Sequence, residues 1–155
     1  MASGESTAAP WHAAYPTPRN TEPATISREA LLDLMTKSNG RAAKDFLLID
    51  LRRTDNEGGM IRGSINLPAQ SLYPTIPALY GVFKAAGLRK IIWFCSSSRG
   101  RGSRAALWFK DYIDDQGDSN MESLILFEGI KGWATAGSEF VQWIDGYNPD
   151  IWAKA

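Results

Sequence analysis

The sequence has few of the residues that build disulfide frameworks and metal centres. Its 155 residues include one cysteine, Cys95, and one histidine, His12. A single cysteine excludes an intrachain disulfide and a multi-cysteine zinc site, and a single histidine excludes a His-rich metal centre. A catalytic pair of serine or cysteine with histidine is disfavoured for the same reason. We therefore expect no metal and no bound cofactor, and any enzymatic chemistry must depend on one thiol and on arginines.

The chain also lacks an excess of one charge and any long hydrophobic run. Lysine and arginine total 17, as do aspartate and glutamate, so the formal net charge is zero. Nucleic-acid and anionic-membrane binding normally require a basic excess, so we expect neither partner. The longest apolar runs, residues 46–49 and 91–95, are far too short to span a bilayer. The absence of the apolar stretch of a secretory signal favours a cytoplasmic or nuclear location.

Composition along the chain indicates one folded domain preceded by a tail. Residues 1–24 are rich in Ala, Ser, Thr and Pro, and their four prolines disfavour a helix. We predict a flexible N-terminal tail over residues 1–24, with Trp11 and Tyr15 able to dock on the domain. A single catalytic domain is predicted over residues 25–155.

Within this domain, short apolar runs alternate with helical patterns. We predict strands at residues 46–50, 64–67, 91–94 and 124–127, and helices after Ser27, over 76–86, over 103–116 and around Trp133. This alternation is typical of an α/β domain whose largely parallel sheet is covered by helices on both faces. In such sheets the chemistry usually lies at the carboxyl ends of the strands.

Residues 91–105 carry the pattern with the most chemical meaning. A buried strand leads to Cys95, a short Ser/Gly/Arg loop follows, and a helix begins near Gly102. Backbone amides at the amino end of a helix are unpaired and carry partial positive charge, so they hold an oxyanion and favour a thiolate. Arg101, six residues after Cys95, can bind two oxygens of the anion with its planar fork. We predict Cys95 and Arg101 as catalytic residues, and an oxyanion site made by Ser96, Ser97, Ser98, Arg99, Gly100 and Arg101.

Three motifs, in order along the chain, resemble the rhodanese-like superfamily. The run from Cys95 to Arg101, followed by Gly102-Ser103-Arg104, is similar to the Cys-(five residues)-Arg-Gly-Pro-Arg sequence of one branch. That branch has a seven-residue Cys-to-Arg loop and includes the cell-cycle dual-specificity phosphatases and the fungal arsenate reductases. Residues 48–52 with 59–68, and residues 126–133, are similar to the two flanking signatures of the superfamily. The resemblance implies a single rhodanese-like α/β domain, with a mostly parallel central sheet and helices on both faces.

The loop length and the departures from the family bear on the substrate. The family implies a six-residue loop for sulfurtransferases, which carry a sulfane sulfur, whereas the seven residues here are wide enough for phosphate or arsenate. Phe94 and Met60 stand where histidine is usual, and Ser103 stands in place of a proline. The loop also lacks the acidic residues of the cell-cycle phosphatases, so a general acid for an alcohol leaving group is not evident.

Carboxylates outside the loop are candidates for this acid by position alone. They are Asp50, Asp55 and Glu57. A structural role is the stronger expectation for each, because structural ion pairs also occupy such positions. We expect Asp50 and Arg52 to form a supporting polar pair under the loop, and Asp55 and Glu57 to lie in a solvated turn.

Two enzymatic hypotheses follow from these residues and the resemblance. The first is a cysteine-dependent phosphatase of the protein tyrosine or dual-specificity type, in which Cys95 attacks a phosphorylated substrate such as a phosphoprotein and water hydrolyses the phosphocysteine. The alternative is an arsenate reductase, with glutathione as co-substrate and glutaredoxin as partner, which needs no acid for an alcohol leaving group. A thiosulfate-type sulfurtransferase is disfavoured by the loop length, and a non-catalytic interaction domain by the presence of both Cys95 and Arg101.

Overall fold

The fold is built around a five-stranded parallel sheet. The computed structural model describes residues 9–37 and 45–153. Its main sheet has the strand order β1-β6-β5-β2-β4, and every neighbouring pair of strands is parallel. The strands are β1 (Ala24–Ile26), β2 (Phe46–Asp50), β4 (Ser64–Asn66), β5 (Lys90–Phe94) and β6 (Glu122–Leu126). The predicted α/β class with a mostly parallel central sheet is confirmed.

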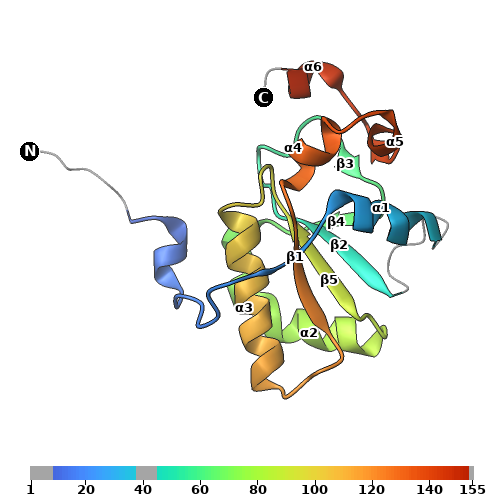
Figure 1. The fold of residues 1–155 in the computed structure, drawn as a ribbon. Helices are drawn as coiled ribbons and strands as arrows, with labels where there is room; N and C mark the ends of the chain where they lie inside the picture. Colours follow the sequence, from blue (N-terminus) through green and yellow to red (C-terminus); the bar gives the residue numbers. More distant parts are fainter. Residues whose placement is uncertain (1–8, 38–44, 154–155) are drawn as a thin grey trace, which may run out of the picture.

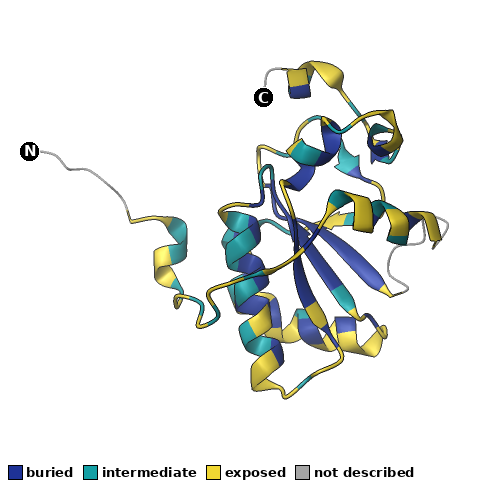
Figure 2. Ribbon diagram, in the orientation of Figure 1, coloured by how far each residue is buried: buried dark blue, intermediate teal, exposed yellow. Residues whose placement is uncertain are grey.

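Helices cover both faces of this sheet (Figure 1). They are α1 (Arg28–Lys37), α2 (Ile76–Ala85), α3 (Arg101–Asp115), α4 (Gly129–Ala134) and α5 (Ser138–Val141). Successive side chains of a strand point to opposite faces, so Leu47 and Ile49 of β2 pack with α2 and α3, while Phe46 and Leu48 pack with α1 and α4. The central strands are therefore buried on both sides, and the outer faces of the helices are exposed (Figure 2).

The ends of several helices are marked by residues that the sequence analysis recognises. The shortest strands and helices are not predicted by any pattern in the sequence. Ser27 Oγ accepts a hydrogen bond from the N–H of Ala30 at 3.0 Å and caps α1, and Gly87, at a φ of +77°, ends α2. The sequence does not predict β1, because only Ile26 of its three residues is buried and no apolar run marks it. The 3-10 helices are η2 (Trp11–Ala14), η3 (Ala69–Ser71) and η4 (Tyr73–Thr75).

The last part of the domain packs on the turn that follows β2. A two-stranded antiparallel sheet joins β3 (Met60–Ile61) to β7 (Ile144–Asp145). Beyond it lies α6 (Pro149–Ala153), in which Trp152 Nε1 donates a hydrogen bond to the carbonyl of Gly58 at 3.0 Å. The carboxyl-terminal part of the domain thus contacts the turn that follows β2.

Residues 9–23 lie along α3. The rings of Trp11, Tyr15, Tyr73 and Trp108 form an aromatic group with centroid separations of 5.1 to 6.1 Å. Aromatic pairs at such separations contribute to packing beyond their buried area. The two aromatic residues of the segment that the sequence analysis singled out for docking therefore contact the domain, while residues 1–8 lie outside the described residues.

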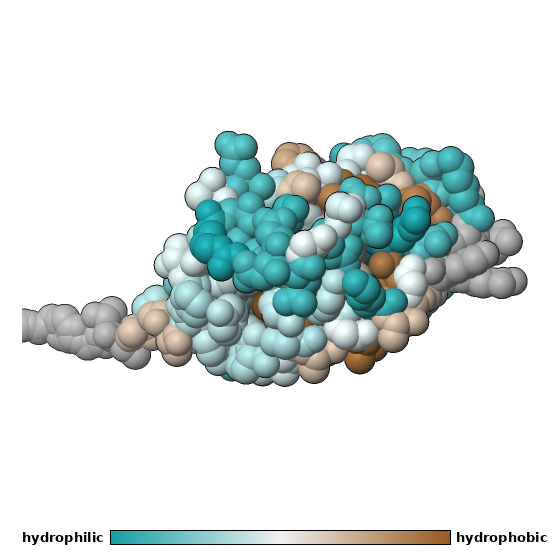
Figure 3. All heavy atoms as spheres, turned by 90° about the horizontal axis from the view of Figure 1, so that it is seen from below, coloured by the Kyte–Doolittle hydropathy of each residue, from teal (hydrophilic) through white to brown (hydrophobic). Residues whose placement is uncertain are grey.

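The end of the molecule opposite the carboxyl ends of the strands has a largely hydrophilic surface. In the view from below, hydrophobic residues occupy several separate areas among polar ones (Figure 3). Lys90 and Glu122, the first residues of β5 and β6, form a partly exposed ion pair of 2.9 Å. None of the helices in the described part of the chain is long and apolar enough to cross a membrane.

Candidate active site

Cys95 lies directly after β5, the central strand of the sheet, and is buried. Its Sγ accepts a hydrogen bond from the backbone N–H of Ser98 at 3.2 Å. Ser98 has a φ of +63°, which non-glycine residues adopt rarely and often at functional sites. This backbone conformation directs the Ser98 amide at the sulfur of the predicted nucleophile.

Ser103 ties the loop to α3. Its hydroxyl donates a hydrogen bond to the carbonyl of Ser98 at 3.1 Å, a bond that the proline expected at this position cannot make. Ser103 lies in the first turn of α3, where backbone amides have no partner within the helix. The departure from the family sequence therefore adds a bond that holds the strained residue of the loop.

The amino end of α4 supports the loop from the other side. The N–H of Ile130 donates to the carbonyl of Cys95 at 3.1 Å, and the N–H of Lys131 donates to the carbonyl of Ser96 at 2.9 Å. Gly129, at a φ of +61°, allows this approach, since a Cβ there would lie 2.4 Å from the Cys95 carbonyl oxygen. Sequence analysis missed this role, although a glycine just after a strand within a family signature is the signal that marks it.

Replacing Gly129 with alanine is expected to displace the loop and to lower activity by at least about tenfold, because small shifts of catalytic groups are costly. The variant should also be less stable than Gly87→Ala. Gly87 has a similar positive φ but open space around it, so that control carries the backbone penalty without the clash. Thermal unfolding and steady-state rates of both variants test this, and equal effects of the two would contradict it.

Arg101 lies between Cys95 and a carboxylate that the sequence analysis placed in a solvated turn. Two nitrogens of Arg101 donate to the two oxygens of Asp55, at 2.9 and 2.6 Å. These bonds hold the pKa of Asp55 well below its usual range. They also raise the pKa of Arg101, to which Cys95 adds a further, smaller effect. Asp55 is therefore paired with the predicted catalytic arginine, although its side chain remains 46% exposed.

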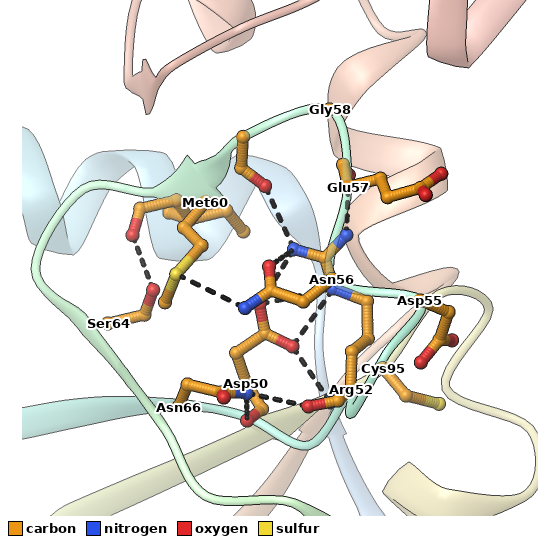
Figure 4. A network of polar contacts seen from close by, with 12 residues as sticks. Asp50, Arg52, Asp55, Asn56, Glu57, Gly58, Met60, Ser64, Asn66 and Cys95 are labelled. Carbon is orange, nitrogen blue, oxygen red and sulfur yellow. Dashed lines mark hydrogen bonds and ion pairs between the residues drawn. The ribbon is translucent and has the colours of Figure 1, made fainter.

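Asp50 and Arg52 form a fully buried ion pair that supports this turn (Figure 4). Arg52 donates to the Asp50 carboxylate through Nε and one terminal nitrogen, the shortest bond being 2.7 Å. It also donates to the carbonyls of Glu57 and Gly59, both at 2.8 Å. The pair thus fixes the turn that carries Asp55, which gives it a structural role beside the site.

The other residues predicted to bind the oxyanion surround an opening of the loop to solvent. Ser96 and Ser97 are half-buried, whereas Arg99 and Gly100 are exposed. Two cavities meet at Arg99: one of about 690 Å³ reaches the end of β6 and α4, and one of about 360 Å³ reaches residues 12–18. The loop residues lie together around this opening, and their roles in oxyanion binding and catalysis stay predictions. Within residues 9–37 and 45–153, no three His, Cys, Asp or Glu side chains are grouped so as to hold a metal ion.

Solved structures share this fold. Ygr203w, a yeast protein tyrosine phosphatase of the Rhodanese family, matches with a TM-score of 0.69 at 23% identity, over 86% of this chain and 99% of that chain. The As-Sb reductase from Leishmania major matches with a TM-score of 0.60 at 21% identity, over 70% of this chain and 73% of that chain. At these identities the likeness shows the fold alone. A comparison with models of known protein families finds no match.

A curated protein is similar in sequence as well. Arsenical-resistance protein 2 of Saccharomyces cerevisiae is 31% identical over 99 residues, which make up 59% of this chain and 76% of the relative. The chain belongs to the rhodanese-like superfamily. The seven residues from Cys95 to Arg101 place it in the branch that the sequence predicts, so the predicted family is confirmed. It is a rhodanese-like protein of the type shared by arsenate reductases and phosphatases.

Proposed function

We propose that this rhodanese-like protein is an arsenate reductase that uses glutathione. The observation that carries the proposal is the state of Asp55, which accepts two hydrogen bonds from Arg101. Because these bonds lower the pKa of Asp55, the carboxylate holds no proton for a leaving alkoxide at neutral pH. Cleavage of an alkyl phosphate ester needs such a proton. Arsenic–oxygen bonds are weaker and exchange with water, so an oxygen leaves arsenate without a held acid.

The proposed reduction takes three steps at Cys95, and two glutathione molecules supply its two electrons. The Cys95 thiolate attacks arsenic while Arg101 and the loop amides hold the other oxygens, an S–As bond forms, and one oxygen takes protons from solvent and leaves as water. A glutathione thiolate then attacks Cys95 Sγ. An S–S bond forms, the S–As bond breaks, and its electron pair stays on arsenic, which becomes arsenite. A second glutathione, acting through glutaredoxin, releases glutathione disulfide and restores the thiol.

Two further observations support the reductase. Cys95 is the only cysteine of the chain, so a reductase built on it takes its resolving thiol from outside, which agrees with the use of glutathione. The sequence relative that decides the family carries the name Arsenical-resistance protein 2, and one of the matching structures is an As-Sb reductase.

The direct test is arsenite formation by the full chain with arsenate, glutathione and glutaredoxin, followed through NADPH oxidation by glutathione reductase. We expect a rate that depends on arsenate, on glutathione and on the protein. Hydrolysis of para-nitrophenyl phosphate by the same preparation is measured in parallel. Fast hydrolysis with no arsenate-dependent NADPH oxidation would reject the reductase in favour of a phosphatase.

A phosphatase is the second candidate, and the larger cavity favours it. This cavity of about 690 Å³ is more than arsenate fills, and Phe127, which is 59% exposed, offers it an apolar surface for an aromatic ring. Ygr203w, which shares the fold, is named as a protein tyrosine phosphatase. Without a proton donor, a phosphatase built on this site should cleave aryl phosphates much faster than alkyl phosphates, because a phenolate leaves unaided.

Replacing Asp55 with asparagine is expected to tighten the binding of inorganic phosphate, an unreactive stand-in for arsenate, by about three- to tenfold. The change removes the negative charge that competes for Arg101. Because the pKa of Asp55 is lowered, its carboxylate stays ionised, and the difference between variant and wild type should hold from about pH 5 to pH 8. Competitive inhibition by phosphate measures it. Glu57→Gln, in the same turn, is the matched control. Weaker phosphate binding to the Asp55 variant would contradict the proposal that the Asp55 carboxylate and the anion compete for Arg101.

A further inference from the structure

The smaller cavity beside the loop has a wall that comes from the start of the chain. Arg99 and Gly100 of the loop line it, together with Ser103 and Arg104 of α3. The facing wall is formed by residues 12–18. Its volume of about 360 Å³ is within the range of small-molecule sites. The cavity therefore adjoins residues that are predicted to hold the oxyanion.

Hydrogen bonds hold this wall against α3. Trp108 Nε1 donates to the carbonyl of Pro16 at 2.8 Å. Farther along the segment, the backbone N–H groups of Arg19 and Asn20 both donate to the carboxylate of Asp111, at 2.7 and 3.0 Å. Together with the aromatic group around Trp108, these bonds make the segment a fixed side of the cavity.

The described residues that line the smaller cavity include two arginines and no carboxylate. Neither the Arg99 nor the Arg104 side chain forms an ion pair with any described residue, and the Arg104 guanidinium lies 5.6 Å from the ring centroid of Trp11. Among the described residues that line this cavity, none is acidic. The larger cavity on the other side of Arg99 is different, because Glu128 lines it together with Lys131. Of the two cavities at the loop, the smaller one is the better site for a ligand that carries carboxylates.

We propose that this cavity binds glutathione, the second substrate of the reductase. The inference rests on the proposed function. Glutathione carries two carboxylates at the ends of a short peptide, which suits the two unpaired arginines, and its peptide groups can pack on Tyr15 and Trp108. Binding there holds the thiol next to the loop, so its attack on the Cys95 sulfur takes place within one complex and is favoured by proximity.

The test uses S-methylglutathione, whose sulfur cannot react, and the full chain. Its titration should shift the indole N–H signals of Trp11 and Trp108 in NMR spectra. Arg104→Gln is expected to raise the Kd by about tenfold, the effect of losing one charge-assisted bond. Trp11→Ala, which removes the ring beside the Arg104 guanidinium, should also raise it. Lys131→Gln, which removes an exposed cation from the larger cavity, is the matched control and should leave the Kd unchanged.

The outcomes separate this proposal from the proposed function. Equal weakening by Arg104→Gln and Lys131→Gln, or no binding of S-methylglutathione to folded wild type, overturns the glutathione site even where arsenate is reduced. Binding that depends on Arg104 supports the site, and it does so even in a protein that fails to reduce arsenate, in which case the reductase is rejected and the site is retained.

Discussion

Replacing Cys95 with serine is expected to lower the rate of arsenate reduction, and of any aryl phosphate hydrolysis, by on the order of a thousandfold or more. A hydroxyl ionises far less readily than a thiol, so the variant has a poor nucleophile. Its oxygen also cannot form the disulfide through which arsenic gains its electrons. Arsenite formation under reducing conditions measures the effect.

Binding and alkylation provide the controls for this variant. Serine is close to cysteine in size, and Arg101 and the loop amides remain, so the variant should still bind inorganic phosphate. Because the chain has no second cysteine, a single adduct with iodoacetamide should account for complete inactivation of the wild type, and phosphate should slow that reaction. Substantial activity in the serine variant would place the nucleophile elsewhere.

Replacing Asp50 with asparagine is expected to lower the free energy of unfolding by about 3 to 5 kcal/mol. The Asp50 side chain is 0% exposed and that of Arg52 is 1% exposed, so the variant leaves a guanidinium in the core without its counter-charge. The new amide group also turns a hydrogen-bond donor towards Arg52. Urea unfolding measures the loss, and we expect the turn that carries Asp55 to lose its order first.

An exposed ion pair serves as the comparison for Asp50. Asp145 accepts a hydrogen bond from Arg62 at 3.0 Å, and its side chain is 61% exposed. Water screens such a pair, so Asp145→Asn should cost less than about 1 kcal/mol. Similar decreases in the free energy of unfolding of the two variants would show that burial does not determine how much the Asp50–Arg52 pair contributes to stability.

Local patterns are sufficient to predict the elements that position the nucleophile. A continuous apolar run predicts β5 because a central parallel strand is buried on both faces. The polar loop and the helical period after Cys95 predict the turn into α3, and Gly87 predicts the end of α2. Each of these signals depends on neighbouring residues alone, and each agrees with the structure.

Contacts between distant segments are what the sequence does not reveal. Asp55 lies in a short polar turn, which read alone indicates a solvated surface, yet it pairs with Arg101, 46 residues away. Prolines in residues 10–23 disfavour a helix, and the structure has the short 3-10 helix η2 there. Composition also does not reveal that Trp108 on α3 donates a hydrogen bond to the carbonyl of Pro16. In both cases the deciding partner belongs to another element, and no local pattern identifies it.

The hydrogen bond from Trp152 to Gly58 gives the last helix an influence on access to the anion site. The turn around Gly58 is held from inside by Arg52 and from outside by α6, a helix of five residues. Short helices open locally at small free-energy cost. Each such opening breaks the contact between α6 and the turn in which Asp55 accepts hydrogen bonds from Arg101. The rate at which α6 frays therefore enters the rate at which an anion displaces Asp55, so a fusion or truncation near residue 152 should be felt in the association kinetics of the substrate.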